Sequence, residues 1–201
     1  MNKILVAYAT MAGSTAEVAQ AVGEEIAGEG IEVDVLPLEK VNSLSAYNAV
    51  VLGAPMIMGW HRSARGFLKK HRKALAHTPL AIFALAMSLT STGEMAVQGI
   101  PVCVDQSLAK TPRNPQHPTF RENYASLTRY APPILGAAGV NKPVSIAFFG
   151  GRLDYTRLKL LARLFVMLAV QAQPGDRRNW QAIRTWAGSL PQLFDSLSTR
   201  N

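Results

Sequence analysis

Short apolar segments alternate along the chain with segments in which apolar residues recur every three or four positions. Residues 3–9, 49–53, 80–87 and 144–149 are apolar runs with the length of buried strands. Residues 31–36 alternate apolar and acidic side chains, which is typical of an edge strand. Because strands and helical segments follow each other in turn, the pattern predicts β-α-β units and hence a parallel sheet with helices on both faces.

Three of the helical segments have a clear apolar face. The first is predicted over residues 15–28, the second, which is strongly basic, over residues 63–76, and the third begins after residues 174–176. Pro191 is predicted to bend or end the third helix, because proline has no N–H to donate within a helix. The side chains expected to be buried are Val18, Val22 and Ile26, then Ala64, Phe67, Leu68 and Leu75, and finally Trp180, Ile183, Ala187, Leu190 and Phe194.

Residues 93–142 interrupt the regular alternation, and within them only residues 121–130 are predicted to be helical. The prolines of this segment are Pro101, Pro112, Pro115, Pro118, Pro132 and Pro133. A connection of this length between two strands usually has a function or forms an interaction surface. An apolar helix is predicted over residues 155–172, either at a membrane interface or buried beneath the insertion. We therefore expect one domain over residues 1–201, with an irregular insertion at 93–142 and this extra helix.

The composition fits a globular domain with a basic surface. Of the 201 residues, 48% are hydrophobic and 17% are charged, which provides enough apolar material for a core. Lysine and arginine together number 21 against 13 acidic residues, giving a net charge of +8. That charge favours an anionic partner, which could be nucleic acid, an anionic membrane surface, or a carboxylated or phosphorylated ligand. A basic surface without such a partner is the alternative.

The sequence also excludes several kinds of site and segment. Cys103 is the only cysteine, which excludes an intrachain disulfide and a multi-cysteine metal or iron–sulfur site and suits a reducing compartment. No histidine stands in a metal-binding motif, so no dedicated metal site is expected. The apolar run at residues 4–9 is too short for a signal peptide. Residues 158–170 contain Lys159 and Arg163 and fall short of the ~20 residues that span a bilayer. We expect a cytoplasmic protein without a transmembrane helix.

The most informative segment is the loop between the first strand and the first helix, which consists of Thr10, Met11, Ala12, Gly13, Ser14 and Thr15. The backbone N–H groups of such a turn, together with those of the helix start, form a cradle for an anion. The hydroxyl groups add donors, and Gly13 allows the backbone to approach a ligand closely. A capping box formed by Ser14 and Glu17 is the alternative explanation of the same residues.

Residues that the loop lacks narrow the class of ligand. It has no Lys-Ser/Thr pair, which excludes the phosphate loop of nucleoside-triphosphate-binding proteins. It has no G-x-G-x-x-G pattern, which disfavours a dinucleotide, although Asp34 stands at a suitable distance for a ribose contact. A hydroxyl-rich loop without a cation suits a phosphate monoester held by backbone amides. Flavin mononucleotide (FMN) is held in this way.

At this loop the sequence resembles the flavodoxin-fold superfamily, whose phosphate loop runs T/S-x-T/x-G-x-T, and residues 50–55 resemble its third strand and flavin-ring loop. It is also similar to the menaquinone-dependent protoporphyrinogen dehydrogenases of the flavodoxin type. The matching stretches are residues 51–61, Phe67-Leu68-Lys69-Lys70-His71, residues 150–155 and Asn179-Trp180, and only residues 93–118 stand apart as an insertion. The resemblance implies FMN as cofactor and a flavodoxin-like three-layer α/β/α sandwich. Its five-stranded parallel sheet would have the order 2-1-3-4-5, with an insertion before the last strand.

The resemblance also implies two further contacts with the flavin. Ser88, Leu89 and Thr90 follow the fourth strand and would bond the pyrimidine edge of the ring, unless they form a plain polar turn. Trp60, in the loop after the third strand, could stack on the ring or pack on the end of the sheet. Because this loop has no second aromatic residue, a one-electron carrier with a tightly sandwiched flavin is disfavoured. The residues of this loop expected to border the ring are Ala54, Pro55, Met56, Ile57, Met58, Gly59 and Trp60.

Clustered basic residues suggest where anionic groups could bind. A solvated helix face is one explanation of the cluster on the second helix, and binding of porphyrin propionates or anionic lipid headgroups is the other. This basic cluster consists of Arg62, Arg65, Lys69, Lys70, Arg72 and Lys73. Around the apolar helix stand Arg152, Arg157, Lys159 and Arg163. These residues favour peripheral contact with an anionic membrane, at the inner face of the cytoplasmic membrane.

The function favoured by these observations is that of an FMN-dependent oxidoreductase, which passes electrons from a reduced substrate to a quinone. Protoporphyrinogen IX is the candidate substrate, and the sequence marks no catalytic residue. A flavodoxin-type electron carrier and an NAD(P)H:quinone reductase of the same fold are alternatives. The net charge of +8 disfavours a carrier, since such carriers are typically acidic. A nucleic-acid-binding domain would explain the charge but not the hydroxyl-rich loop, so no nucleic-acid partner is expected.

Overall fold

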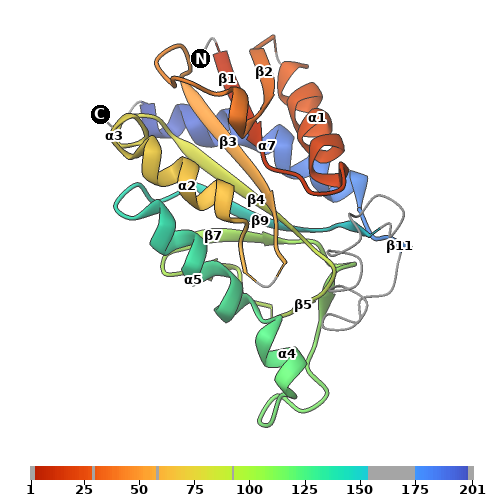
Figure 1. Cartoon of the computed structure of the whole chain (residues 1–201). Helices are drawn as coiled ribbons and strands as arrows, with labels where there is room; N and C mark the ends of the chain where they lie inside the picture. The colour runs from red at the N-terminus through yellow and green to blue at the C-terminus, as the bar shows by residue number, and fades with distance from the viewer. Residues whose placement is uncertain (1–2, 29, 58, 92, 154–174, 199–201) are drawn as a thin grey trace.

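A computed structural model describes residues 3–28, 30–57, 59–91, 93–153 and 175–198, which form a three-layer α/β/α sandwich (Figure 1). The middle layer is a sheet of seven described strands. α1 (Ser14–Ala27) and α7 (Trp180–Ser198) cover one face of it. α2 (Arg62–Lys70), α3 (Arg72–Leu75) and α5 (Leu127–Ala138) cover the other. The flavodoxin-like α/β fold that the sequence predicts is confirmed.

Five parallel strands lie in the predicted order, which is β2-β1-β3-β4-β9. Their bounds are β1 (Lys3–Tyr8), β2 (Glu32–Pro37), β3 (Ala49–Pro55), β4 (Leu80–Ala86) and β9 (Ser145–Gly150). β3, β4 and β9 are buried along their whole length, because helices cover both faces, and this burial accounts for their continuous apolar sequence. β2 lies at the edge of the sheet, as its alternating pattern indicates.

The sheet has two more strands than predicted, and both come from residues 93–142. β7 (Ile100–Val104) pairs in parallel with β9, and β6 (Ala96–Val97) pairs antiparallel with β7. Pro101 obscured this strand in the sequence, because a proline argues against a strand inside a sheet. In the structure, pairing with β9 begins only at Val102, so the missing N–H of Pro101 removes no bond between these two strands.

Residues 93–142 are also more regular than predicted. They contain β8 (Ala109–Lys110), which pairs with β5 (Leu89–Thr90), as well as α4 (Phe120–Tyr124) and α5. The helix predicted at 121–130 is thus divided between α4 and α5. α5 continues through Pro132 and Pro133. Its apolar side is buried against the sheet, and this tertiary packing offsets the loss of two backbone donors.

Two predicted helices differ from the structure in their extent. The basic helix is divided at His71 into α2 and α3, while all of its predicted apolar residues are buried. α7 does not end at Pro191 but runs to Ser198. Leu190 and Phe194, on either side of that proline, are both fully buried, so the packed face carries the helix through it.

Of the two tryptophans of α7, the one predicted to be buried is partly exposed, and the other is buried. Trp180 was expected in the core, but it begins the helix and is 39% exposed. Trp186, which was not expected there, is buried, and its Nε1–H donates to Ser145 Oγ at 3.0 Å. An amphipathic pattern places the start of a helix poorly, because the first turn extends beyond the sheet that the helix covers.

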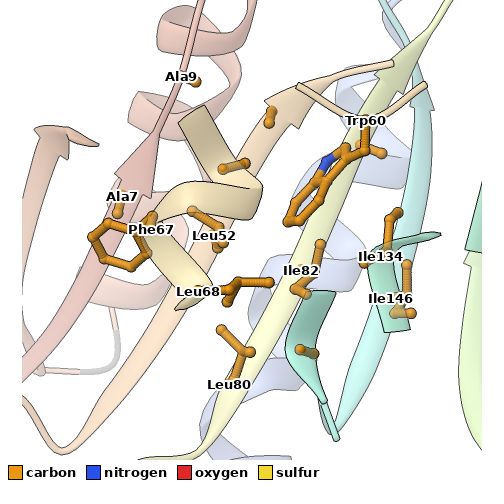
Figure 2. Close-up of a cluster of buried hydrophobic side chains, with 14 of the residues drawn as sticks. Ala7, Ala9, Leu52, Trp60, Phe67, Leu68, Leu80, Ile82, Ile134 and Ile146 are labelled. Atoms are coloured by element: carbon orange, nitrogen blue, oxygen red, sulfur yellow. The ribbon is translucent and has the colours of Figure 1, made fainter. Parts of the chain in front are cut away.

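The core consists of one apolar layer on each side of the sheet. Figure 2 shows the layer beneath α2, in which Phe67 and Leu68 of the helix face Leu52 and Ile82 of the strands. The second layer lies beneath α1 and α7 and includes Phe83 and Phe149. A short 3-10 helix, η1 (Leu38–Lys40), follows β2.

The predicted apolar helix at residues 155–172 lies outside the described residues. On its two sides stand β10 (Arg152–Leu153) and β11 (Gly175–Asp176), which pair antiparallel with each other.

Candidate cofactor site

Three loops stand at the carboxyl edge of the sheet, and they are the ones that the sequence singles out. They follow β1, β3 and β4, which are parallel neighbours, so the loops leave the sheet side by side. In open α/β sheets, ligands bind in this position, beyond the carboxyl ends of the strands. The structure therefore places the three predicted loops at one edge, while the contacts of their residues with a flavin stay predictions.

The loop after β1 has the shape of an anion cradle. Gly13 has a left-handed backbone (φ 90°) and is the N-cap of α1. Its N–H donates to Thr10 Oγ1 at 2.9 Å, which closes the loop on itself. Met11, within the loop, is 47% exposed and takes no part in the core. The first N–H groups of α1 have no acceptor within the helix and carry its positive dipole end, which suits a phosphate.

The Thr15 hydroxyl is a buried polar group that a ligand in the cradle could satisfy. Its side chain is 1% exposed, and its hydroxyl has no hydrogen-bond partner among the described residues. A buried hydroxyl that makes no hydrogen bond costs free energy. A phosphate at the start of α1 would supply an acceptor, so the donors of this loop fit the phosphate of FMN.

The capping box considered as an alternative is not formed. It would require Ser14 as the N-cap, but the N-cap is Gly13, and the Glu17 N–H donates to the Gly13 carbonyl at 3.1 Å. The Glu17 carboxylate instead pairs with Arg178, which lies between β11 and α7.

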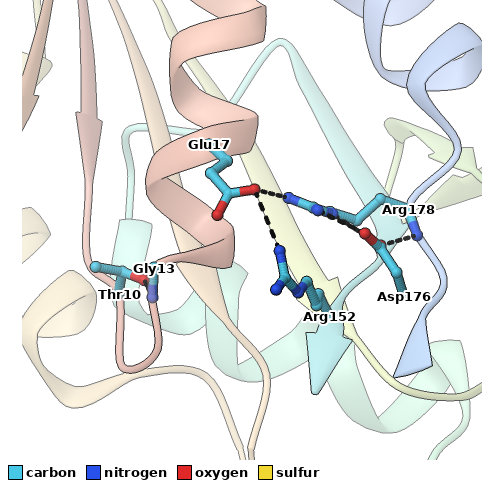
Figure 3. Close-up of polar contacts among 6 residues, drawn as sticks. All are labelled: Thr10, Gly13, Glu17, Arg152, Asp176 and Arg178. Atoms are coloured by element: carbon cyan, nitrogen blue, oxygen red, sulfur yellow. Dashed lines mark hydrogen bonds and ion pairs between the residues drawn. The ribbon is translucent and has the colours of Figure 1, made fainter. Parts of the chain in front are cut away.

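An ion-pair network beside the loop was missed in the sequence (Figure 3). Arg178 Nη1 lies 2.6 Å from Glu17 Oε2, and its Nη2 lies 2.6 Å from Asp176 Oδ2. Arg152 Nη1 lies 3.9 Å from the same Glu17 oxygen. The arginine holds the pKa of Asp176 below its usual range, chiefly through their side-chain hydrogen bond. No sequence signal joins Glu17 to Arg178, 161 positions away, so only the fold reveals this network.

The loop after β3 turns its tryptophan inward. Trp60 is 2% exposed and lies in the core beside Ile82 and Ile134, as Figure 2 shows. A bridge pairs it with Met56, which is also buried, and the Ile57 N–H donates to the Gly59 carbonyl at 3.0 Å. In this structure the indole thus takes the packing role, the second of the two alternatives.

The other residues of this loop are divided between core and surface. Ala54 and Pro55 end β3 and are buried, Ile57 is 38% exposed, and Met58 lies outside the described residues. Gly59 has φ 111°, which favours glycine at this turn. Ile57 therefore offers the apolar surface that a flavin ring could contact here.

The loop after β4 is joined to the insertion. Leu89 is fully buried, and the Thr90 N–H donates to the Ala125 carbonyl at 2.8 Å. Ser88 is exposed. Leu89 and Thr90 thus belong to a short strand that pairs with β8, whereas the alternative explanation was a plain polar turn. Ser88 carries the most exposed hydroxyl group of the three predicted residues.

The basic cluster on α2 and α3 lies on the surface. All six of its side chains are exposed, and Lys70 Nζ is 3.5 Å from the Val41 carbonyl oxygen. His61 begins α2 and accepts a hydrogen bond from the Ser63 N–H. Burial lowers the pKa of His61, so the imidazole stays neutral at pH 7 and adds no charge to the cluster.

The comparisons with known proteins agree with this fold. The model of a flavodoxin domain family matches residues 5–179. The chain belongs to this flavodoxin domain family. FMN is the cofactor of flavodoxin domains, so the predicted cofactor is confirmed at the level of the family.

One relative matches over nearly its whole length. The protein named "Protoporphyrinogen IX dehydrogenase [quinone]" of Escherichia coli (strain K12) is 22% identical over 206 residues, covering 96% of this chain and 97% of that protein.

Two solved structures also align with the chain. The rubredoxin oxygen:oxidoreductase of Desulfovibrio gigas aligns with a TM-score of 0.49 at 15% identity, covering 98% of this chain and 37% of that one. A short-chain flavodoxin associated with a bacterial microcompartment aligns with a TM-score of 0.38 at 19% identity, covering 42% and 60%. The chain thus matches less than two thirds of either structure's length.

Proposed function

We propose that this protein is an FMN-dependent dehydrogenase that passes electrons from a reduced substrate to a quinone, and that protoporphyrinogen IX is the substrate. The observation that carries this proposal is the end-to-end similarity to the Escherichia coli protoporphyrinogen IX dehydrogenase. The phosphate cradle supports it independently, because the buried Thr15 hydroxyl has no hydrogen-bond partner within the part of the chain that the structure describes, and the phosphate of FMN would supply one.

The chain's own groups would bind and position the reactants. The loop from Thr10 to Thr15 would hold the phosphate of FMN. The exposed part of the Ile57 side chain would contact the flavin ring. When bound, the flavin supplies the redox chemistry. In each net turnover, two electrons and two protons leave the substrate and convert a quinone to a quinol. The basic cluster directly after the ring loop would attract the carboxylates of a porphyrin.

Turnover with purified reactants tests the proposal. Protein loaded with FMN is mixed under anaerobic conditions with protoporphyrinogen IX and a menaquinone analogue, and porphyrin fluorescence is followed. We expect porphyrin to form only when protein, FMN and quinone are all present. Reduction of the quinone by NAD(P)H but not by protoporphyrinogen would instead identify the reductase alternative, and no quinone reduction with either donor would favour the electron carrier.

We further propose that the protein contacts an anionic membrane, where a quinone acceptor dissolves. No helix among the described residues is long and apolar enough to cross a bilayer. The exposed basic cluster supports peripheral contact, because each lysine or arginine near an anionic surface contributes about 1 kcal/mol.

A further inference from the structure

We propose that Arg178 is a positioning residue for the phosphate of FMN, which it serves by neutralising Glu17 in the first turn of α1. This inference rests on the proposed cofactor site and assigns a role to residues outside the predicted loops. Glu17 lies one turn after Gly13, the N-cap of the cradle. A carboxylate in this place would repel a phosphate dianion unless a cation compensates its charge.

The geometry of Arg178 suits a fixed counter-ion. Its side chain is only 4% exposed, although it carries a full charge. The guanidinium reaches Asp176 through Nε at 2.8 Å and Nη2 at 2.6 Å, and it reaches Glu17 through Nη1 at 2.6 Å. The two bonds to Asp176 form the bidentate pairing that orients a guanidinium strongly. Asp176 therefore fixes the orientation of the Arg178 guanidinium, which in turn forms an ion pair with Glu17.

A ring contact restricts Arg178 further. Its Cζ lies 4.6 Å from the centroid of the Trp180 ring, within the range of a cation–π interaction. This contact accounts for the partly exposed position of Trp180 at the start of α7, where its ring covers the guanidinium instead of joining the core. β11 and α7 thus hold the cation in place before a ligand binds.

A second arginine near α1 provides a matched control. Arg184 of α7 also approaches α1, with Nη1 3.4 Å from Glu25 and Nη2 3.8 Å from Glu24. It is 44% exposed and meets acids near the carboxyl end of α1, away from the cradle. Replacing Arg184 removes a cationic link from α7 to α1 without altering the charge beside the phosphate.

The experiment compares FMN with riboflavin, which has the same ring but no phosphate. Dissociation constants of both are measured by quenching of flavin fluorescence with wild-type apoprotein and with the variants Arg178→Met, Arg184→Met, Glu17→Gln and Glu17→Gln/Arg178→Met. We expect Arg178→Met to weaken FMN binding about tenfold, because a partly uncompensated carboxylate then stands in the first turn of the helix that receives the phosphate, and to leave riboflavin binding unchanged. Arg184→Met should change neither.

The double variant keeps the inference falsifiable if loss of Arg178 disturbs folding. Removing the Glu17 charge as well should restore FMN binding to within about threefold of wild type. The single variant Glu17→Gln, which keeps the Arg178–Asp176 pair, should bind FMN at least as tightly as wild type. Equal weakening of FMN and riboflavin by Arg178→Met, or no restoration in the double variant, would overturn the role in phosphate binding. Failure of the wild-type protein to bind FMN would instead contradict the proposed cofactor site itself.

Discussion

At the scale of single residues, Thr15 combines two properties that are seldom found together. It is almost completely buried, and its hydroxyl has no partner among the described residues. Burial without a hydrogen bond is unfavourable for the protein alone, but it prepares a donor for a ligand that arrives at the start of α1.

We expect Thr15→Val to separate folding from binding. Valine keeps the shape of the side chain and removes the hydroxyl, so the apoprotein should be as stable as wild type or more stable. A hydrogen bond to a charged group contributes about 1.5–3 kcal/mol, so FMN should bind at least tenfold more weakly. Urea unfolding of the apoprotein and flavin fluorescence titration measure the two effects, and Thr15→Ser should retain binding. Unchanged FMN affinity in Thr15→Val would show that the hydroxyl does not contact the phosphate.

We expect a side chain at Gly13 to weaken FMN binding by more than the backbone strain that it causes can explain. Gly13 and Gly30 both have positive φ angles, 90° and 75°, so a β-branched residue strains either position. Gly30 lies beyond the carboxyl end of α1, and a Cβ added there meets no atom within 4 Å. Gly13→Val and Gly30→Val should therefore both lower the melting temperature, but only Gly13→Val should abolish FMN binding. Similar FMN affinity in the two variants would reduce the loop to a helix cap.

At the scale of elements, the sequence predicted what depends on local pattern and missed what depends on packing. The five parallel strands and their order followed from buried runs and the family resemblance. β7 was missed because Pro101 resembles a strand breaker, and α5 because Pro132 and Pro133 resemble helix breakers. In each case the buried neighbours of the proline decide the structure, and those neighbours are distant in the sequence.

Ionisation of Tyr130 in α5 should lower the stability of the protein at alkaline pH. Its ring stacks on Phe148 of β9 with centroids 6.4 Å apart, and burial raises its pKa to about 12. An unfolded tyrosine ionises near pH 10, so the folded state keeps the proton that the unfolded state loses. The stability that Tyr130 contributes is therefore complete below pH 10 and is lost as the pH rises towards 12.

Tyr130→Phe keeps the ring and removes this titration. Between pH 9 and pH 11, the free energy of unfolding should fall more steeply for wild type than for Tyr130→Phe, when both are unfolded in urea. The pKa of Tyr47 is raised as well, so the variant should keep part of the pH dependence. Parallel curves for the two proteins would show that Tyr130 ionises normally in the fold.

At the scale of the whole molecule, the sequence predicted which loops meet at one edge of the sheet, but not the ion pairs that lie beside them. The three predicted loops follow neighbouring parallel strands, so topology alone brings them together. Glu17, Asp176 and Arg178 could not be joined from the sequence, because their contact depends on how α7 returns beside α1. The role of Trp60 was likewise undecided until the fold placed its indole in the core.

The basic cluster on α2 and α3 predicts how the whole protein meets a membrane. Its six cations are exposed, and contact with anionic headgroups through them would hold the protein at the surface of the membrane in which a quinone dissolves. Sedimentation with vesicles should therefore show binding to anionic but not to neutral lipid, and binding should weaken with salt because screening acts beyond about 8 Å at physiological ionic strength. Arg157, Lys159 and Arg163, which the sequence analysis also places at the membrane, lie outside the described residues and would add to this binding.

A pair of triple variants separates a specific surface from the net charge of +8. Replacing Arg65, Lys69 and Arg72 with glutamine removes three cations of the basic cluster, which should lower the partition constant by about a hundredfold at ~1 kcal/mol for each residue. Replacing Lys110, Arg113 and Arg184 with glutamine removes the same charge from other exposed positions and should lower it far less. Equal losses in the two variants would mean that overall charge, not this surface, attracts the membrane. Binding to neither kind of vesicle by wild type would leave the cluster to a soluble anionic substrate, whose KM should then rise in the first variant only.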